Sequence, residues 1–257
     1  MKYNLRNEMP VCGFAAVKTL EKINAHKIQR LYFTEERAPL FGGLCKKMAA
    51  AKKPYNKVQD PEELEKLSGT VHHQGVVAMI TPPEILPLNT AITAMWIEEK
   101  QDAIILDRVG NSNNLGAIIR SAAFFGIKNI VIPIDEAQSS ITTSSYRVAE
   151  GGMEFVNVYS VKSIEFLLKD MEGKMMRFGT SLEATKKVSE IKSACKSKPA
   201  LIVLGNEEKG ISKEVQRNCD ELIIIPFAGM GTKSDSPKID SLNVAQAASV
   251  IMYELSK

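Results

Sequence analysis

Long apolar runs are missing from the sequence, and no stretch approaches the ~20 residues that a membrane-spanning helix needs. The 257 residues include only four cysteines, which stand far apart without a C-x-x-C pair, so we expect neither a disulfide framework nor a metal site. The first ten residues lack the apolar core of a secretory signal, which predicts a cytoplasmic protein. The remaining composition, 44% hydrophobic and 25% charged, is typical of a globular chain with room for two modest domains.

Positive charge is concentrated in the N-terminal part of the chain. Residues 1–80 hold 13 lysines and arginines against 8 acidic residues, whereas the rest of the chain has a small acidic excess. The stretch KKMAAAKKPYNK (46–57) brings five lysines together without an acid. Such a stretch suits a surface that binds phosphates, and equally a solvated helix face. The candidates for RNA binding here are Lys46, Lys47, Lys52 and Lys53.

Two domains and a linker are predicted from the hydrophobic patterns. Helix-like and strand-like patterns alternate over residues 11–80, which indicates a small α/β sandwich in a domain at 1–82. TPPEILPLNT (81–90) has three prolines and predicts a linker over 83–100. The part at 101–257 alternates helical stretches with short unbroken apolar runs, which predicts an open, mostly parallel sheet with helices on both faces. Those runs are 103–106, 129–132, 154–160, 175–180, 200–204 and 222–226.

The stretch LDRVGNSNNLGAIIR follows the first of these runs, where the ligand crevice of an open α/β sheet lies. Asn114 is placed to cap the next helix, and Gly126 to end it. Arg120 passes over Gly116 and Ala117, which offer almost no side chain, so it can reach the helix mouth, where an anion is stabilised. The alternative is a plain cap and an ordinary surface arginine.

Two later strand ends also carry polar residues. In ALIVLGNEEKGIS, Glu207 follows the strand end, and Gly210 allows a turn before Ser212, which can cap the next helix. LIIIPFAGM is followed by DSLNVAQAAS, where Ser241 and Asn243 occupy a helix start. No G-x-G-x-x-G turn with an acid about 20 residues further on is present, so a dinucleotide enzyme is disfavoured.

Together these stretches resemble the three motifs of the SpoU (TrmH-like) ribose 2′-O-methyltransferases of the SPOUT superfamily. The motifs are N-L-G-x-x-x-R (114–120), L-G-x-E-x-x-G (204–210), and I-P-x-x-G (225–229) followed by S-L-N-V (241–244). The resemblance covers about residues 101–257. The N-terminal part, with V-x-G-x-x-A-V at 11–17 and HHQGVVA at 72–78, is similar to the RNA substrate-binding domain that precedes the catalytic domain in many members.

The resemblance implies a function: S-adenosylmethionine-dependent methyl transfer to a ribose 2′-hydroxyl of structured RNA, with rRNA slightly favoured over tRNA. It also implies a C-terminal trefoil knot that binds the cofactor, and a homodimer through the knotted domain. Arg120 matches the catalytic arginine, which engages the target phosphate and hydroxyl and acts as, or supports, the base. Asn114, Glu207, Ser241 and Asn243 match positions that place the RNA, the arginine or the cofactor. The implied cofactor-binding residues are Leu204, Gly205, Gly210, Ile225, Pro226, Gly229, Met230, Ser241, Leu242, Asn243 and Val244.

Some features depart from the family pattern. The stretch between Gly229 and Ser241 is longer than usual, and it fits either a lid that orders with RNA or an altered activity. The rival to the enzyme is therefore a catalytically silent RNA-binding or ribosome-assembly protein that retains the fold. His72 and His73 suit either RNA contact or a solvent or core pair.

Overall fold

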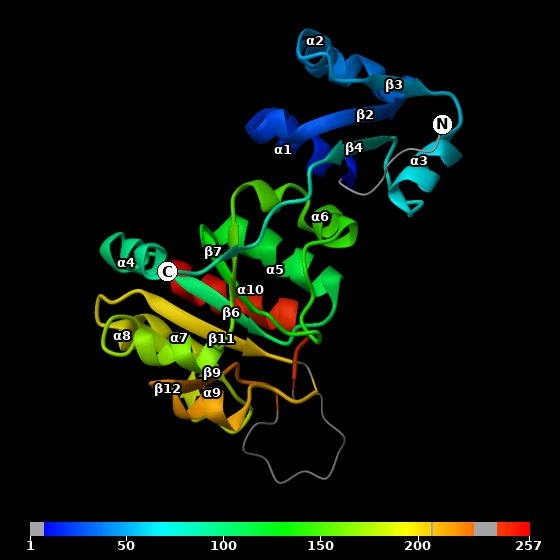
Figure 1. Ribbon diagram of the computed structural model, residues 1–257. Helices are drawn as coiled ribbons and strands as arrows, with labels where there is room; N and C mark the ends of the chain where they lie inside the picture. The colour runs from blue at the N-terminus through cyan, green and yellow to red at the C-terminus, as the bar shows by residue number, and fades with distance from the viewer. Residues whose placement is uncertain (1–7, 207, 229–240) are drawn as a thin grey trace. The chain divides into compact units, whose positions relative to one another are not determined.

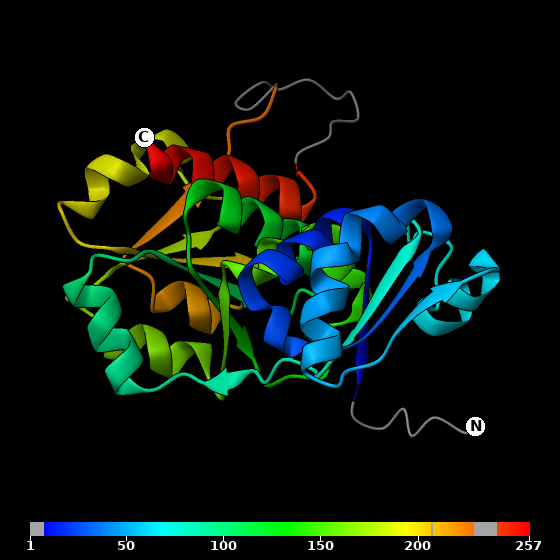
Figure 2. The ribbon, with the colours of Figure 1, turned by 90° about the horizontal axis from the view of Figure 1, so that it is seen from above.

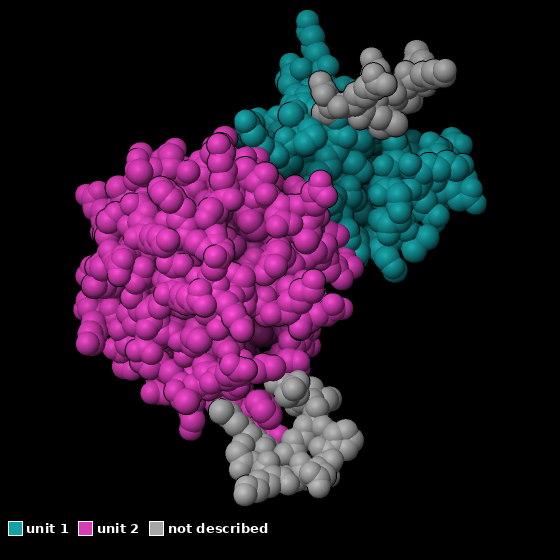
Figure 3. All heavy atoms as spheres, turned by 60° about the horizontal axis from the view of Figure 1, so that its bottom comes forward, with its two compact units in different colours: residues 1–84, 141–155 teal, residues 85–140, 156–257 magenta. Residues whose placement is uncertain are grey.

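The computed structural model describes residues 8–206, 208–228 and 241–257 (Figure 1). Its contacts divide the chain into two compact units, which Figure 3 distinguishes by colour. Unit 1 comprises residues 1–84 and 141–155, and unit 2 comprises residues 85–140 and 156–257. Among the described helices, none is long and apolar enough to cross a membrane.

Unit 1 is built on a four-stranded sheet in the order β1-β4-β2-β3. The central strand β4 is antiparallel to both neighbours and buried along its whole length, whereas β2 and β3 are parallel. The helix α1 buries Ala16, Val17 and Leu20. The elements are β1 (Met9–Cys12), α1 (Phe14–Asn24), β2 (Ile28–Thr34), α2 (Gly42–Ala50), β3 (Tyr55–Val58), α3 (Pro61–Ser68), β4 (Val76–Ile80) and α6 (Thr143–Ala149).

The last of these elements comes from the later part of the chain. Helix α6 and the 3₁₀ helix Gly152–Glu154 group with unit 1, although they lie within the range 101–257 assigned to one domain from the sequence. The Glu154 side chain is fully buried and accepts hydrogen bonds from Asn24 Nδ2 (2.6 Å), Lys27 Nζ (3.1 Å) and the Tyr146 hydroxyl (3.1 Å). Burial and the adjacent Glu154 raise the pKa of Tyr146. A buried carboxylate therefore ties this segment to the N-terminal residues.

Unit 2 contains an eight-stranded sheet in the order β10-β12-β9-β11-β6-β7-β8-β5, in which every pair of neighbours is parallel. This confirms the mostly parallel sheet. Its strands are β5 (Leu86–Pro87), β6 (Ala103–Asp107), β7 (Asn129–Pro133), β8 (Asn157–Val161), β9 (Met176–Thr180), β10 (Lys186–Lys187), β11 (Ala200–Gly205) and β12 (Glu221–Ile224). The helices are α4 (Thr90–Glu98), α5 (Ser112–Phe125), α7 (Ile164–Asp170), α8 (Ile191–Cys195), α9 (Lys213–Arg217) and α10 (Val244–Ser256).

Helices cover both faces of this sheet (Figure 2). Residues of α4, α7 and α9 pack with Ile105 and Val203 in one core cluster. Because strand side chains alternate, the equally buried Ile104 and Ile202 face the other side, where α5 and α10 pack together. Trp96 of α4 is fully buried in the first cluster, so residues 90–98 of the segment expected to be a linker form part of unit 2.

Candidate functional site

The carboxyl ends of β6 and β11 lie side by side at the point where the strand order reverses. The chain passes from β6 to β7 and β8 on one side, and later places β11 on the other side of β6. In the register, Gly205 at the end of β11 is paired with Asp107 at the end of β6. Ligands of open α/β sheets bind in the crevice beyond such a switch point, which makes this edge the candidate site.

Helix α5 begins just beyond β6, and its cap differs from the prediction. Asn111, not Asn114, is the N-cap: its Oδ1 accepts a hydrogen bond from the Asn113 amide at 2.8 Å. Asn114 lies in the first helical turn instead. The glycine prediction is confirmed, because Gly126 ends the helix with φ +77° in the left-handed region, which glycine adopts without strain.

Asn114, which does not cap α5, contacts the start of α10 instead. Asn243 Nδ2 donates a hydrogen bond to Asn114 Oδ1 at 3.1 Å, across 129 residues of sequence. Asn243 is also the N-cap of α10, with its Oδ1 accepting from the Ala245 amide at 2.9 Å. The structure therefore brings the first and the last of the three stretches together. One amide side chain both caps α10 and contacts α5.

Arg120 lies in the middle of α5 with an exposed side chain. Gly116, one turn earlier, is buried. The next residue, Ser121, fixes this part of α5 against α10, since its Oγ lies 2.7 Å from Ser249 Oγ. Glu207, expected beside Arg120, lies outside the described residues.

The β11 loop folds tightly back on its own strand end. A Cβ atom on Gly205 would lie 2.3 Å from the carbonyl carbon of Gly210 and 2.4 Å from the Ile211 nitrogen, so only glycine fits. Gly210 has φ +62°, again in the left-handed region. Ser212 then caps α9 by accepting a hydrogen bond from the Val215 amide at 3.1 Å, as expected.

The remaining residues predicted to bind the cofactor lie in three places. Leu204 is buried in β11. Ile225 and Pro226 directly follow β12, and Gly229 and Met230 lie outside the described residues. Ser241 and Leu242 are exposed just before Asn243, whereas Val244 is the buried first residue of α10.

Comparisons with known proteins show the family of the chain. Residues 102–253 match the model of the SpoU rRNA Methylase family, and residues 10–86 match that of RNA 2′-O ribose methyltransferase substrate binding. The chain belongs to the SpoU rRNA Methylase family.

Two curated relatives and two solved structures illustrate the similarity. The 23S rRNA (guanosine-2′-O-)-methyltransferase RlmB of Acinetobacter baylyi is 31% identical over 240 residues, covering 93% of this chain and 88% of that protein. An uncharacterized tRNA/rRNA methyltransferase of Haemophilus influenzae is 34% identical over 172 residues, which cover 66% of this chain and only 47% of that protein.

The structural neighbours match nearly the whole chain. AviRb of Streptomyces viridochromogenes in complex with AdoMet has a TM-score of 0.70 at 21% identity, covering 98% of this chain and 90% of its own. An AdoMet-bound rRNA methyltransferase of Sinorhizobium meliloti has a TM-score of 0.72 at 21% identity, covering 97% and 87%. At this identity the likeness shows the SpoU fold alone.

The lysines of the lysine-rich stretch 46–57 differ in their contacts. Lys46, Lys47 and Lys52 are exposed at α2 and the turn after it. The ammonium group of Lys53 instead donates to the carbonyl oxygens of His26 (2.7 Å) and Ile28 (2.6 Å), so this lysine stabilises the start of β2.

The two histidines are placed differently. His73 is 7% exposed, and its Nδ1 accepts a hydrogen bond from the Gly75 amide at 3.1 Å. This contact favours the core interpretation for His73, whereas His72 is exposed.

Sequence reasoning missed the residues that hold the turn after β6. Arg108 has φ +58°, which is unusual outside glycine, and its guanidinium pairs with the Asp107 carboxylate through two contacts of 2.8 and 3.1 Å. The hydrogen bond to Asp107 raises the pKa of Arg108. Asn206 and Gln138 also contact this turn. The positions of Asp107 and Arg108 could have indicated a role, because they lie at the carboxyl end of β6. Nothing in the sequence indicates a role for Gln138.

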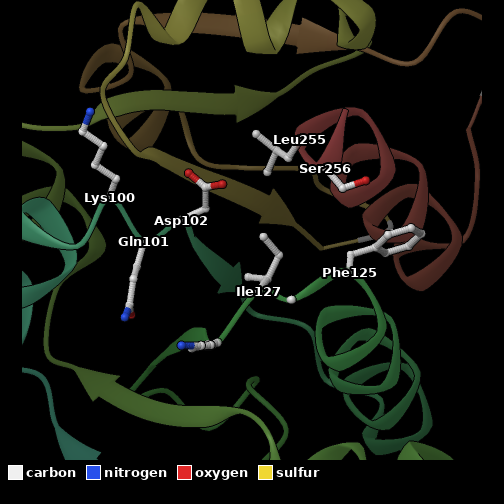
Figure 4. Close-up of a pocket in the computed structure, with 9 residues that line it drawn as sticks. Lys100, Gln101, Asp102, Phe125, Ile127, Leu255 and Ser256 are labelled. Carbon is white, nitrogen blue, oxygen red and sulfur yellow. The ribbon is translucent and has the colours of Figure 1, made fainter.

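A cavity of about 250 Å³ lies at the opposite, amino-terminal ends of the strands (Figure 4). The carboxylate of Asp102 lies among its lining side chains, together with Phe125 and Leu255. Burial raises the pKa of Asp102, against the hydrogen bond that it accepts from the Ala200 amide. None of the SpoU motif residues that the structure describes lines this cavity, so it is not the candidate site.

Proposed function

We propose that this protein transfers a methyl group from S-adenosylmethionine to a ribose 2′-hydroxyl of structured RNA at the carboxyl-terminal edge of the unit 2 sheet. The observation that carries the proposal is the hydrogen bond between Asn243 and Asn114, which joins two of the three family motifs. The strand end of the third motif, Gly205, is paired with Asp107 at the end of β6, and ligands of open α/β sheets bind beyond such a switch point.

The residues at this edge fit S-adenosylmethionine. At Gly205 the main chain of Gly210 and Ile211 approaches so closely that no Cβ atom fits, which leaves main-chain groups beside the strand end that neighbours β6. Residues 225–228 and 241–244 supply further main-chain and small polar groups. Leu204 to Gly210, Ile225 to Met230 and Ser241 to Val244 would hold the cofactor, which supplies an electrophilic methyl group.

Arg120 has the central chemical role in the proposed reaction. A ribose hydroxyl is a poor nucleophile at neutral pH, so it must be oriented and begin to lose its proton as it attacks. The exposed Arg120 binds the phosphate next to the target ribose and orients the hydroxyl. Asn114, Glu207, Ser241 and Asn243 position the arginine, the RNA and the cofactor.

Ribosomal RNA is the favoured substrate, and tRNA is the alternative. The Acinetobacter relative, which matches 93% of this chain, is described as a 23S rRNA methyltransferase, and residues 10–86 match the family's substrate-binding domain. In that domain, Lys46, Lys47 and Lys52 are exposed and available for phosphates, whereas Lys53 acts through the local fold. With such a substrate, the location we propose is the cytoplasm.

The proposed enzyme is a homodimer with a trefoil knot, as the family pattern implies. One observation supports the dimer. The outer surface of α5 and α10 exposes Phe124 (82%) and Tyr253 (50%), large side chains suited to a second copy of the chain.

Calorimetry with S-adenosylmethionine, followed by transfer of a labelled methyl group to total RNA and mapping of 2′-O-methyl sites, tests the function. We expect Arg120→Ala to bind the cofactor like the wild type and to lose at least about 100-fold in transfer rate. Arg217→Ala, another exposed helical arginine of unit 2, is the matched control. Cofactor binding and transfer both absent in the wild type would instead favour the silent RNA-binding protein.

A further inference from the structure

The main chain leaves β6 in an unfavourable conformation. Arg108 has φ +58°, and Gly110 lies so close to the Ala137 carbonyl that a Cβ atom there would be 2.9 Å from its oxygen. A non-glycine residue in the left-handed region persists only where its surroundings hold it. The turn at residues 107–110 connects β6 to α5, the helix with Asn114 and Arg120.

Gln138 holds this turn from the side of β7. The Val109 amide donates to Gln138 Oε1 at 2.9 Å, and Gln138 Nε2 donates back to the Val109 carbonyl at 3.1 Å. The side chain therefore pairs with Val109 as a neighbouring strand would. Gln138 is 9% exposed and Val109 2% exposed, so water does not compete for these groups.

Asn206 holds the same turn from the side of β11. Its Nδ2 donates to the Arg108 carbonyl at 3.1 Å, while its Oδ1 accepts from the amides of Glu208 (2.9 Å) and Lys209 (3.2 Å). One side chain thus links the turn after β6 to the loop after β11. Together with Gln138 it fixes two successive peptide groups of a strained turn.

We propose that Gln138 is a positioning residue for the proposed methyl transfer: by pairing with both main-chain groups of Val109, it fixes the direction in which α5 leaves the sheet and hence the place of Arg120. The proposal rests on the proposed function. Gln138 touches neither RNA nor cofactor in this role. It acts through the turn: α5 begins three residues after Val109, so the orientation of the Val109 peptide groups sets the direction of the helix.

Gln138→Met tests this role, since it keeps the length of the side chain and removes its hydrogen bonds. We expect kcat for methyl transfer to fall by about 10- to 100-fold, with the Kd for S-adenosylmethionine within about 3-fold of the wild type. The amide of Val109 should exchange faster with solvent, as should the first-turn amides of α5. Gln138→Glu keeps the acceptor for the Val109 amide but loses the donor to its carbonyl, and should be impaired as well.

Gln101→Met is the matched control, because Gln101 Oε1 accepts from Asn129 Nδ2 (2.9 Å) at the opposite edge of the sheet. It should lower the melting temperature by a similar amount and leave kcat per folded molecule unchanged. Wild-type kcat in Gln138→Met despite faster exchange at Val109 would overturn the positioning role alone. A wild type without methyl transfer would overturn the proposed function and the positioning role together.

Discussion

Asn243 uses the two ends of its side-chain amide for different purposes, with Oδ1 capping α10 and Nδ2 donating to Asn114. These two roles can be separated. Asn243→Asp keeps a capping oxygen but places a second oxygen against Asn114 Oδ1. We expect the melting temperature to stay within about 2 °C of the wild type and methyl transfer to fall at least about tenfold.

The same substitution at another helix cap tests whether the loss of methyl transfer is specific to the site. Asn89 caps α4 in the same way, by accepting from the Ile92 amide at 3.1 Å. Asn89→Asp should therefore change neither stability nor activity appreciably. An Asn243→Asp protein with full activity would show that donation by residue 243 to Asn114 is not needed.

The second prediction concerns the loop after β11. Gly205→Ala would place a Cβ atom 2.3 Å from the main chain of Gly210, which cannot give way as a flexible side chain would. The loop must therefore move, and we expect the affinity for S-adenosylmethionine to fall at least about tenfold, measured by calorimetry. Gly42→Ala is the control, because nothing lies within 4 Å of a Cβ atom at this helical position. Unchanged affinity in Gly205→Ala would remove this loop from the cofactor site.

The third prediction concerns stability and pH. Arg177, 5% exposed, donates to the Asp220 carboxylate through Nε (3.0 Å) and Nη2 (2.6 Å), and these bonds lower the pKa of Asp220. A carboxylate with a lowered pKa stabilises the fold above its unfolded pKa of about 4, and this contribution is lost as the pH falls through the folded value. Asp220→Asn should cost about 2–3 kcal/mol at pH 7, since the carboxylate is only partly buried.

Urea unfolding of both proteins between pH 7 and pH 3 measures this difference. The difference in the free energy of unfolding between the wild type and Asp220→Asn should become smaller toward low pH. A gap that stays constant over this range would mean that the ion pair does not account for the effect of the substitution.

The buried strands could be predicted from the sequence because they are apolar on both faces. The runs at 103–106 and 200–204 lie within β6 and β11, whose residues are all buried. The run at 154–160 was less accurate: β8 begins at Asn157, because Glu154 ends a 3₁₀ helix of unit 1. A buried carboxylate held by Asn24 and Lys27 depends on contacts across some 130 residues, which no local pattern reveals.

The candidate site was predicted in part. The motif residues Asn114 and Asn243 do meet, but the wrong asparagine was chosen as the cap, since Asn111, Asn113 and Asn114 stand within four residues and each has the chemistry for it. Gln138 was missed for another reason. Its role consists of hydrogen bonds to a main chain 29 residues earlier, and a glutamine in a loop carries no signal of its own.

The last prediction tests whether residues 141–155 stabilise unit 1. The Glu154 side chain is fully buried and accepts three hydrogen bonds, so removing its carboxylate leaves the buried Tyr146 hydroxyl and the partly buried donors of Asn24 and Lys27 without an acceptor. Glu154→Ala should lower the free energy of unfolding by about 3 kcal/mol, whereas Glu136→Ala, at an exposed position of unit 2, should change it by less than about 0.5 kcal/mol. Hydrogen exchange locates the effect: β1 and α1 should lose protection, while β6 and β11 keep it. Equal loss in both units, or none in β1, would mean that Glu154 does not hold this segment to the N-terminal sheet.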